Sequence, residues 1–263
     1  MQFLSQQGED IYILTHFINK PNPNGVFVEL GACDGLVYSN TYFFERYLNF
    51  KGILIEPNKD LFKKLEENKK THRSQSICIQ KAINTEKDDV LFLSSTTLDN
   101  KPCGGIKKHM SDDHISMWFS KDTETYTVET ATLSSIFLKN NITYIDFFSL
   151  DVEGGELEVL QTIDFTKVEI YVICIELTNK NGEHEQKCRQ LLLQKGFTFK
   201  QRMSINEFWV NDQYSRTNEV YNPNISIPFN GIENNSKRSS TMGTHPFTEL
   251  SQLDTINKLC KNT

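Results

Sequence analysis

Four acidic residues stand at the ends of apolar, strand-like segments, and a turn follows each of them closely. They are Glu29, Glu56, Asp151 and Glu176. Ligands of open α/β sheets bind at the edge formed by the carboxyl ends of the strands. Carboxylates at that edge can accept hydrogen bonds from hydroxyl groups, hold a hard cation or take up a proton. The pattern therefore predicts a ligand site built on acidic side chains.

The segment 29–35, Glu-Leu-Gly-Ala-Cys-Asp-Gly, does not fit the common phosphate-binding motifs. A P-loop needs Gly-Lys followed by Ser or Thr, and a dinucleotide fingerprint would need glycine where Cys33 and Leu36 stand. An NAD-dependent oxidoreductase is therefore disfavoured. Close backbone approach at Gly31 and Gly35 suits a nucleoside that carries an amino acid, and Glu56 can accept two hydrogen bonds from ribose hydroxyls.

The elements that must position these residues alternate between helix and strand from residue 8 to residue 210. This alternation is typical of a parallel sheet with crossover helices. Strands are expected at 25–30, 52–56, 76–83, 90–93, 128–133, 145–151, 169–176, 197–199 and 208–210, and helices at 9–17, 40–48, 59–69, 134–140, 156–163 and 183–195. The last two strands are expected to form an antiparallel pair.

Two segments interrupt this rhythm. Residues 94–127 are polar, and such a long polar stretch is usually a functional lid or a binding loop. Its Lys107-Lys108 and Trp118-Phe119 pairs are candidates for an acceptor-binding surface, although Trp118 and Phe119 would equally serve as an apolar anchor. Residues 211–263 are expected to form a tail or strap with a short helix at 248–258, so the main domain is predicted to be residues 1–210.

Composition excludes several classes of protein. The chain has 263 residues and a formal charge of −6, so no net positive field attracts nucleic acid or an anionic membrane. No apolar run is long enough to span a bilayer, and the first residues do not read as a signal peptide. The six cysteines lack metal-finger spacing and suit a reducing compartment. We therefore expect a cytoplasmic protein.

Several motifs in one order resemble those of the FkbM-type S-adenosylmethionine-dependent methyltransferases. They are SQQGED at 5–10, FVELGACDG at 27–35, SNT at 39–41, GILIEP at 52–57, KAI at 81–83, TL at 132–133 and DFFSLDVEGGE at 146–156. The resemblance implies a class I methyltransferase fold: a doubly wound, mostly parallel, seven-stranded sheet with an antiparallel last hairpin and helices on both faces. Glu29 and Gly155 are mild departures from the Asp and Ala that family members commonly carry.

The resemblance also implies that S-adenosyl-L-methionine lies across the first two strands. Glu56 would bind the ribose, Glu29 or Asp34 the ammonium group, and Ala82 and Ile83 would flank the adenine. The full predicted set is Gln7, Glu29, Gly31, Ala32, Asp34, Gly35, Ser39, Asn40, Glu56, Pro57, Ala82 and Ile83. Helix capping explains Ser39 and Asn40 at least as well, and helix initiation explains Gln7 about as well.

Methyl transfer to a hydroxyl requires that its proton be removed or weakened. Asp151, Glu153 and Glu176 are the candidates, and three converging carboxylates would repel one another unless one is protonated or a cation lies between them. We therefore expect Asp151 and Glu176 to hold Mg²⁺ or Mn²⁺, by analogy of position with catechol O-methyltransferase. The competing general base is His184, shortly after the strand that ends at Glu176.

The sequence thus predicts an O-methyltransferase whose acceptor, as the resemblance implies, is a sugar or glycan hydroxyl. The alternatives are a binding module that has kept the fold without catalysis and an enzyme acting on a small non-sugar metabolite. His109 and His114 are weaker candidates for the base than His184. The number of subunits stays open, and a homo-oligomer is compatible with the sequence.

Overall fold

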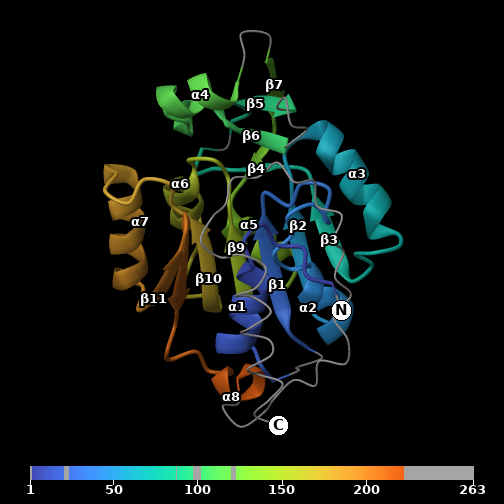
Figure 1. Cartoon of the computed structure of the whole chain (residues 1–263), viewed down its shortest axis with the longest axis vertical. Coiled ribbons are helices and arrows are strands. Elements are labelled where there is room, and N and C mark those ends of the chain that lie inside the picture. The colour runs from blue at the N-terminus through green and yellow to red at the C-terminus, as the bar shows by residue number, and fades with distance from the viewer. Residues whose placement is uncertain (1, 21–23, 87, 97–101, 120–122, 222–263) are drawn as a thin grey trace.

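The central element is a seven-stranded sheet, seen in a computed structural model that describes residues 2–20, 24–86, 88–96, 102–119 and 123–221 (Figure 1). The strand order is β11-β12-β10-β9-β1-β2-β3. The strands are β1 Val26–Leu30, β2 Lys51–Ile55, β3 Ser76–Ile79, β9 Tyr144–Leu150, β10 Glu169–Glu176, β11 Thr198–Met203 and β12 Asn206–Val210. All neighbours pair parallel except β12 with β10 and β11 with β12, which confirms the predicted antiparallel hairpin.

Helices cover both faces of this sheet because its strands carry apolar side chains on both sides. In β1, Phe27 packs with the helices α1 and α2, whereas Val28 and Leu30 pack with α5, α6 and α7. The helices are α1 Glu9–His16, α2 Tyr42–Leu48, α3 Lys59–Lys69, α5 Leu133–Lys139, α6 Glu156–Gln161 and α7 Glu183–Gln194. Apolar runs buried on both faces are typical of parallel sheets, so the predicted doubly wound α/β fold is confirmed.

A second, smaller sheet lies beyond the carboxyl edge of the first, at the top of Figure 1. It contains β5 Val90–Thr96, β6 Pro102–Ile106 and β7 Glu124–Val128, which pair antiparallel in the order β6-β5-β7. Two short helices, η1 Lys107–His109 and α4 Asp112–Trp118, lie between β6 and β7 along the chain. We call the segment 94–127 the lid, and its described residues have regular structure where a polar loop was expected. Apolar residues on the inner side of this sheet, including Phe92 and Ile106, form their own cluster and explain the difference.

Two strands predicted as continuous are divided. The expected strand 76–83 ends at Ile79 and is followed by β4 Ala82–Ile83, which leaves the main sheet and pairs with β8 Thr130–Ala131. The expected strand 128–133 is shared between β7, β8 and the start of α5. The interruptions turn the chain toward the lid, and they bring Ala82 and Ile83 to the carboxyl edge of β2.

The packed domain continues past residue 210. Tyr214 stacks on Tyr171 with ring centroids 5.2 Å apart, and Val220 of α8 Thr217–Val220 is fully buried. The helix predicted at 248–258 lies outside the described residues. Within the residues that the structure describes, no helix combines the length and the apolar character that a membrane span requires.

Candidate active site

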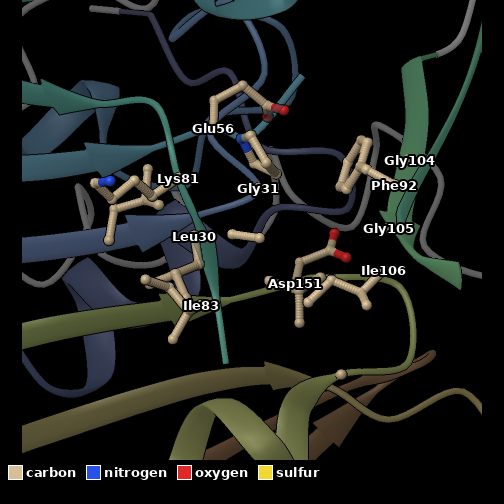
Figure 2. A pocket seen from close by; sticks show the side chains of 15 residues that line it. Leu30, Gly31, Glu56, Lys81, Ile83, Phe92, Gly104, Gly105, Ile106 and Asp151 are labelled. Atoms are coloured by element: carbon tan, nitrogen blue, oxygen red, sulfur yellow. The ribbon is translucent and has the colours of Figure 1, made fainter. Parts of the chain in front are cut away.

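A cavity opens where the ends of β1, β2 and β9 meet the lid. Figure 2 shows Gly31 between Glu56 and Asp151, with Gly104 and Gly105 of β6 on the lid side. The main sheet therefore supplies one wall of the cavity and the lid supplies another.

A second cavity adjoins the first and shares Leu30, Gly31, Glu56, Gly104 and Asp151 with it. Its other walls carry more polar side chains. They include Gln6, Tyr38, Asn40, Asn58, Ser149, Glu153, Glu176 and Thr178 from the main domain and Cys103, His114 and Trp118 from the lid. The two cavities form one trough along the carboxyl edge of the sheet, as the positions of the acidic residues predicted.

Gly31 makes the trough possible. Its φ of +74° lies in the left-handed region, and a Cβ atom there would stand 2.0 Å from the carbonyl oxygen of Asp151. Any larger residue would therefore push the end of β1 away from the end of β9. Gly35 has a different role, because a Cβ atom there would stand 2.6 Å from Leu65 Cδ1 of α3. Gly35 does not line the trough.

Glu56 lies at the junction of the two cavities. Its Oε2 accepts a hydrogen bond from the backbone N–H of Cys33 at 2.9 Å, and its Oε1 accepts one from that of Asn58 at 2.8 Å. Burial raises the pKa of Glu56 to about 7 in spite of these hydrogen bonds. The carboxylate is thus held rigidly, and it keeps lone pairs for a ligand.

Glu29 is occupied by the loop that follows β1. It accepts hydrogen bonds from Ser39 Oγ at 2.9 Å, Thr41 Oγ1 at 2.6 Å and the backbone N–H of Asn40 at 2.7 Å. Asn40 is thereby fixed against the trough, where its Nδ2 donates to Ser149 Oγ at 3.0 Å. Its Oδ1 is buried without a hydrogen-bond partner among the described residues, so this oxygen can accept a hydrogen bond from a ligand in the trough.

The predicted cofactor residues divide into two groups. Those that line the trough are Glu29, Gly31, Asn40, Glu56, Pro57, Ala82 and Ile83, whereas Gln7, Ala32, Asp34, Gly35 and Ser39 do not line it. Asp34 Oδ1 accepts from the backbone N–H groups of Leu36 and Val37, and Ala32 is part of the core. Gln6 lines the trough in place of its neighbour Gln7. Asp34 thus shapes the loop that follows β1, and a role of the five residues off the trough in cofactor binding stays a prediction.

Three carboxylates converge in the second cavity. Asp151, Glu153 and Glu176 offer oxygen atoms that all lie within 4.8 Å of one another. Burial, and then the neighbouring charges of Glu176 and Glu153, raise the pKa of Asp151 well above its ordinary value. Burial, and then the charges of Glu153 and Glu156, raise the pKa of Glu176 to about 8, and burial raises that of Glu153 to about 7. The cluster therefore retains protons at neutral pH when no cation is bound.

The histidines are not equivalent. His184 lies in a neighbouring cavity, where its Nε2 stands 3.3 Å from Glu158 Oε2, and this contact raises the pKa of His184. His114 lines the trough itself, with its Nε2 3.2 Å from Glu153 Oε2, and burial lowers its pKa. The structure thus brings His114, a weaker candidate from the sequence, to the trough, whereas His184 and His109 line a third cavity that His114, Glu153 and Glu176 also line.

The lid contributes residues that sequence reasoning missed or left open. Trp118 lines the trough, as one of the two interpretations of that residue predicted. Lys107 and Lys108 do not line it, and Lys108 pairs with Glu86 instead. Cys103 was missed because its spacing from His114 follows no common ligand motif.

Comparisons with known proteins identify the family. Residues 29–199 match the family described as Methyltransferase FkbM domain, whereas no curated protein matches the chain. The fold is similar to that of M. capricolum TrmK, solved with S-adenosyl-homocysteine, at 12% identity and a TM-score of 0.41 over 80% of this chain and 68% of that one. A FkbM methyltransferase of Methylobacillus flagellatus KT is matched at 11% identity and a TM-score of 0.40, over 72% of this chain and 44% of that one.

A putative caffeoyl-CoA O-methyltransferase of Staphylococcus aureus is also similar in fold, at 10% identity and a TM-score of 0.44 over 80% of this chain and 84% of that one. The family match covers more than half of the sequence and contains the end of β1 and all of β2, β9 and β10, the strands that build the trough. The chain therefore belongs to the FkbM methyltransferase domain family, and its chemistry is S-adenosylmethionine-dependent methylation.

Proposed function

We propose that this protein transfers a methyl group from S-adenosyl-L-methionine to a hydroxyl oxygen of a sugar or glycan precursor. The observation that carries the proposal is the convergence of Asp151, Glu153 and Glu176 in the same trough that holds Glu56. A nucleoside site and a proton-accepting site are then adjacent, as methyl transfer to a hydroxyl requires.

The polar groups of the trough fit the cofactor. Glu56 would accept hydrogen bonds from the ribose hydroxyls, and the unpartnered Oδ1 of Asn40 would accept one from the ammonium group of the methionine part. Ala82 and Ile83 offer an apolar surface for the adenine. When bound, S-adenosyl-L-methionine supplies an activated methyl group. The chain's own contribution is to orient the acceptor and to take its proton.

The carboxylate cluster suits proton removal from a hydroxyl. A general base works best when its pKa lies near the operating pH. The pKa values of Glu153, about 7, and of Glu176, about 8, meet that condition. Either carboxylate would hold the acceptor hydroxyl by a hydrogen bond and take up its proton as the oxygen is methylated.

A sugar acceptor is supported by the character of the second cavity. Trp118 lines it and is 38% exposed, so one part of the indole is free for a ligand. Carboxylates that accept hydrogen bonds from hydroxyls, together with an aromatic face, are the groups that sugars need.

Binding of Mg²⁺ or Mn²⁺ by Asp151 and Glu176 stays a prediction. It is supported by the carboxylate oxygens of Asp151, Glu153 and Glu176, which lie within 4.8 Å of one another. If the metal assists, EDTA should abolish methyl transfer and added Mg²⁺ or Mn²⁺ should restore it. Activity that is unchanged in EDTA, and is not increased by either ion, would exclude this role.

The central experiment measures cofactor binding and methyl transfer separately. Calorimetry should show S-adenosyl-L-methionine binding to the wild type. Glu56→Ala should weaken this binding by about tenfold or more, because one or two charge-assisted hydrogen bonds are lost. Glu67→Ala, at an exposed position on α3, is the matched control and should bind normally.

Transfer is then followed with a methyl-labelled cofactor and a panel of sugars, glycan precursors, small phenols and amines. Labelled sugar ethers that disappear in Asp151→Asn would support the proposal. Cofactor binding without transfer to any hydroxyl would favour the non-catalytic alternative. Transfer to amines or to non-sugar metabolites alone would replace the proposed acceptor class.

A further inference from the structure

Cys103, His114 and Glu153 come together from three separate elements at the border between the lid and the main sheet. Cys103 Sγ lies 3.8 Å from His114 Nε2 and 3.7 Å from Glu153 Oε1. His114 Nε2 lies 3.2 Å from Glu153 Oε2. One sulfur, one nitrogen and one carboxylate group therefore form a compact triangle, in which Cys103 and His114 contact different oxygens of Glu153.

The spacing of these side chains is close to that of zinc ligands. Zinc bonds of about 2.3 Å to sulfur and about 2.0–2.2 Å to nitrogen and oxygen separate tetrahedral ligand atoms by about 3.3–3.6 Å. The three observed contacts, 3.2, 3.7 and 3.8 Å, involve both oxygens of Glu153. One ligand atom from each of the three residues lies within 4.8 Å of the other two, so an ion between them would draw the atoms together.

We propose that Cys103, His114 and Glu153 bind one Zn²⁺ ion, with a fourth position that opens toward the trough. Thiolate and imidazole ligands favour zinc over Mg²⁺ or Mn²⁺, which prefer oxygen. The site shares Glu153 with the cluster of Asp151, Glu153 and Glu176, but it differs from that cluster in its sulfur and nitrogen ligands. Three protein ligands with an open fourth position are typical of zinc ions that bind water or a substrate oxygen.

The fold fixes each ligand. Cys103 is paired with Ser95 in the β5–β6 ladder and is 8% exposed. His114 belongs to α4, whose first turn is capped by Ser111 Oγ, which accepts from the backbone N–H of His114 at 3.1 Å. Glu153 has a φ of +59°, an unusual value for a residue with a side chain, and it lies in the loop after β9, whose last residue is Leu150.

All three ligands line the second cavity, so an ion held by them would face the trough. Asp151 and Glu176 lie next to Glu153 and add negative charge around the site. Because two ligands come from the lid and one from the loop after β9, the ion would also tie the lid to the carboxyl edge of the main sheet. Zinc binding should therefore order the lid.

The test uses metal content and needs neither the cofactor nor the methyl acceptor. The full chain, kept reduced, is stripped with a chelator, reloaded with zinc, desalted and analysed for zinc per chain. The wild type should retain one zinc ion, and Cys103→Ser and His114→Gln should each weaken binding by about a hundredfold or more, as expected for a lost ligand. Cys78→Ser and His72→Gln, which change the same residue types outside the triangle, should retain it.

Cobalt gives a spectroscopic check of the sulfur ligand. Co²⁺ in the wild type and in Cys78→Ser should produce a thiolate-to-metal charge-transfer band, and Cys103→Ser should lack that band while circular dichroism shows a normal fold. Loss of zinc in the two lid variants should also increase cleavage of the lid by a protease.

Three outcomes would overturn the proposal. One is a reloaded wild type without stoichiometric zinc, because the triangle would then be a hydrogen-bonded contact only. Another is zinc that remains bound in both Cys103→Ser and His114→Gln. The third is zinc lost from Asp151→Asn but not from the two lid variants, which would assign the ion to the carboxylates. None of these results bears on whether S-adenosyl-L-methionine binds, so this proposal and the proposed function fail separately.

Discussion

Two groups of buried carboxylates in this molecule are compensated in different ways. Glu29 and Glu45 surround Arg73, whose side chain is fully buried. Its Nε donates to Glu45 Oε2 at 2.7 Å, and its Nη1 and Nη2 donate to Ser39 Oγ at 2.9 Å and Thr41 Oγ1 at 2.7 Å. Every charge in this group meets an opposite charge or a hydrogen bond.

The second group is Asp151, Glu153 and Glu176. Among the described residues, no lysine or arginine forms an ion pair with any of the three, and His114 is the only basic partner, 3.2 Å from Glu153. Burial and mutual repulsion instead raise the pKa values of all three. A folded protein tolerates such an arrangement at a site where a proton or a cation is used. The comparison thus separates acids that hold the loop after β1 in place from acids that are available for chemistry.

The largest expected effect comes from removing the cation of the first group. Arg73→Met leaves Glu29 and Glu45 buried without their partner, and we expect a loss of about 3–5 kcal/mol in the free energy of unfolding. Urea denaturation measures it. Arg46→Met is the matched control, because Arg46 is exposed on α2, and it should change stability by less than about 0.5 kcal/mol. Equal effects of the two substitutions would contradict the distinction between the groups.

The second group should show the opposite behaviour. The pKa of Glu176 is raised from its ordinary value of 4.5 to about 8, so the folded state binds a proton more tightly than the unfolded chain does. The stability that this proton contributes is fully present below pH 4.5 and is lost as the pH rises through about 8. In the presence of a chelator, the free energy of unfolding should fall by about 3 kcal/mol between pH 5.5 and 8.5 because of this group.

Glu176→Gln should remove most of this slope and raise the stability at pH 8.5, while Glu67→Gln, at an exposed position, should keep it. Urea denaturation of the three proteins at both pH values gives the comparison. A wild type whose stability does not fall over this range, or a slope that is retained in Glu176→Gln, would show that the cluster is compensated in a way the contacts do not reveal.

The sequence was a good guide to the sheet and to the second group, and a poor guide to the first. Strands such as β9 and β10 are predictable because buried parallel strands are continuous apolar runs, and each run ends in an acid at the carboxyl edge. Asp151 and Glu176 could therefore be predicted as neighbours. Arg73 could not, because nothing local distinguishes a buried arginine from an exposed one; its partners are 28 residues away at Glu45 and farther at Glu29.

The same limit applies to the lid. The polar residues of 94–127 suggested a loop, and only the long-range pairing of β5 with β6 and β7 makes it a sheet. Cys103 and His114 meet Glu153 through that pairing, although the cysteine and the glutamate are 50 positions apart in the sequence. Tertiary contacts of this kind leave no periodic signal in the sequence, so the sequence contained the ligands without indicating that they meet.

Glu56 is intermediate between the two groups in how its charge is compensated. Backbone N–H groups donate to it, as in the first group, but burial still raises its pKa to about 7, as in the second. Only the ionised carboxylate accepts two strong hydrogen bonds from a ribose. The fraction ionised rises from about a tenth at pH 6 to about nine tenths at pH 8, so the affinity for S-adenosyl-L-methionine should increase by up to about tenfold. Calorimetry at both pH values measures it, and Glu56→Gln should bind weakly with no such dependence. A wild-type affinity that is constant with pH would remove Glu56 from the ribose site.

The smallest effect concerns a further compensated acid, Asp146, at the opposite end of β9 from the trough. Its Oδ1 accepts from Tyr214 Oη at 2.8 Å and its Oδ2 from the backbone N–H of Val26 at 2.7 Å. Tyr214→Phe should keep the stacking on Tyr171 and lose only the hydrogen bond, which lowers the free energy of unfolding by about 1 kcal/mol. Urea denaturation would measure this loss, and cofactor affinity should not change. A loss close to that of Arg73→Met would mean that the packing of residues 211–221 depends on this one contact. No loss at all would mean that Val26 and Arg216 satisfy Asp146 without it.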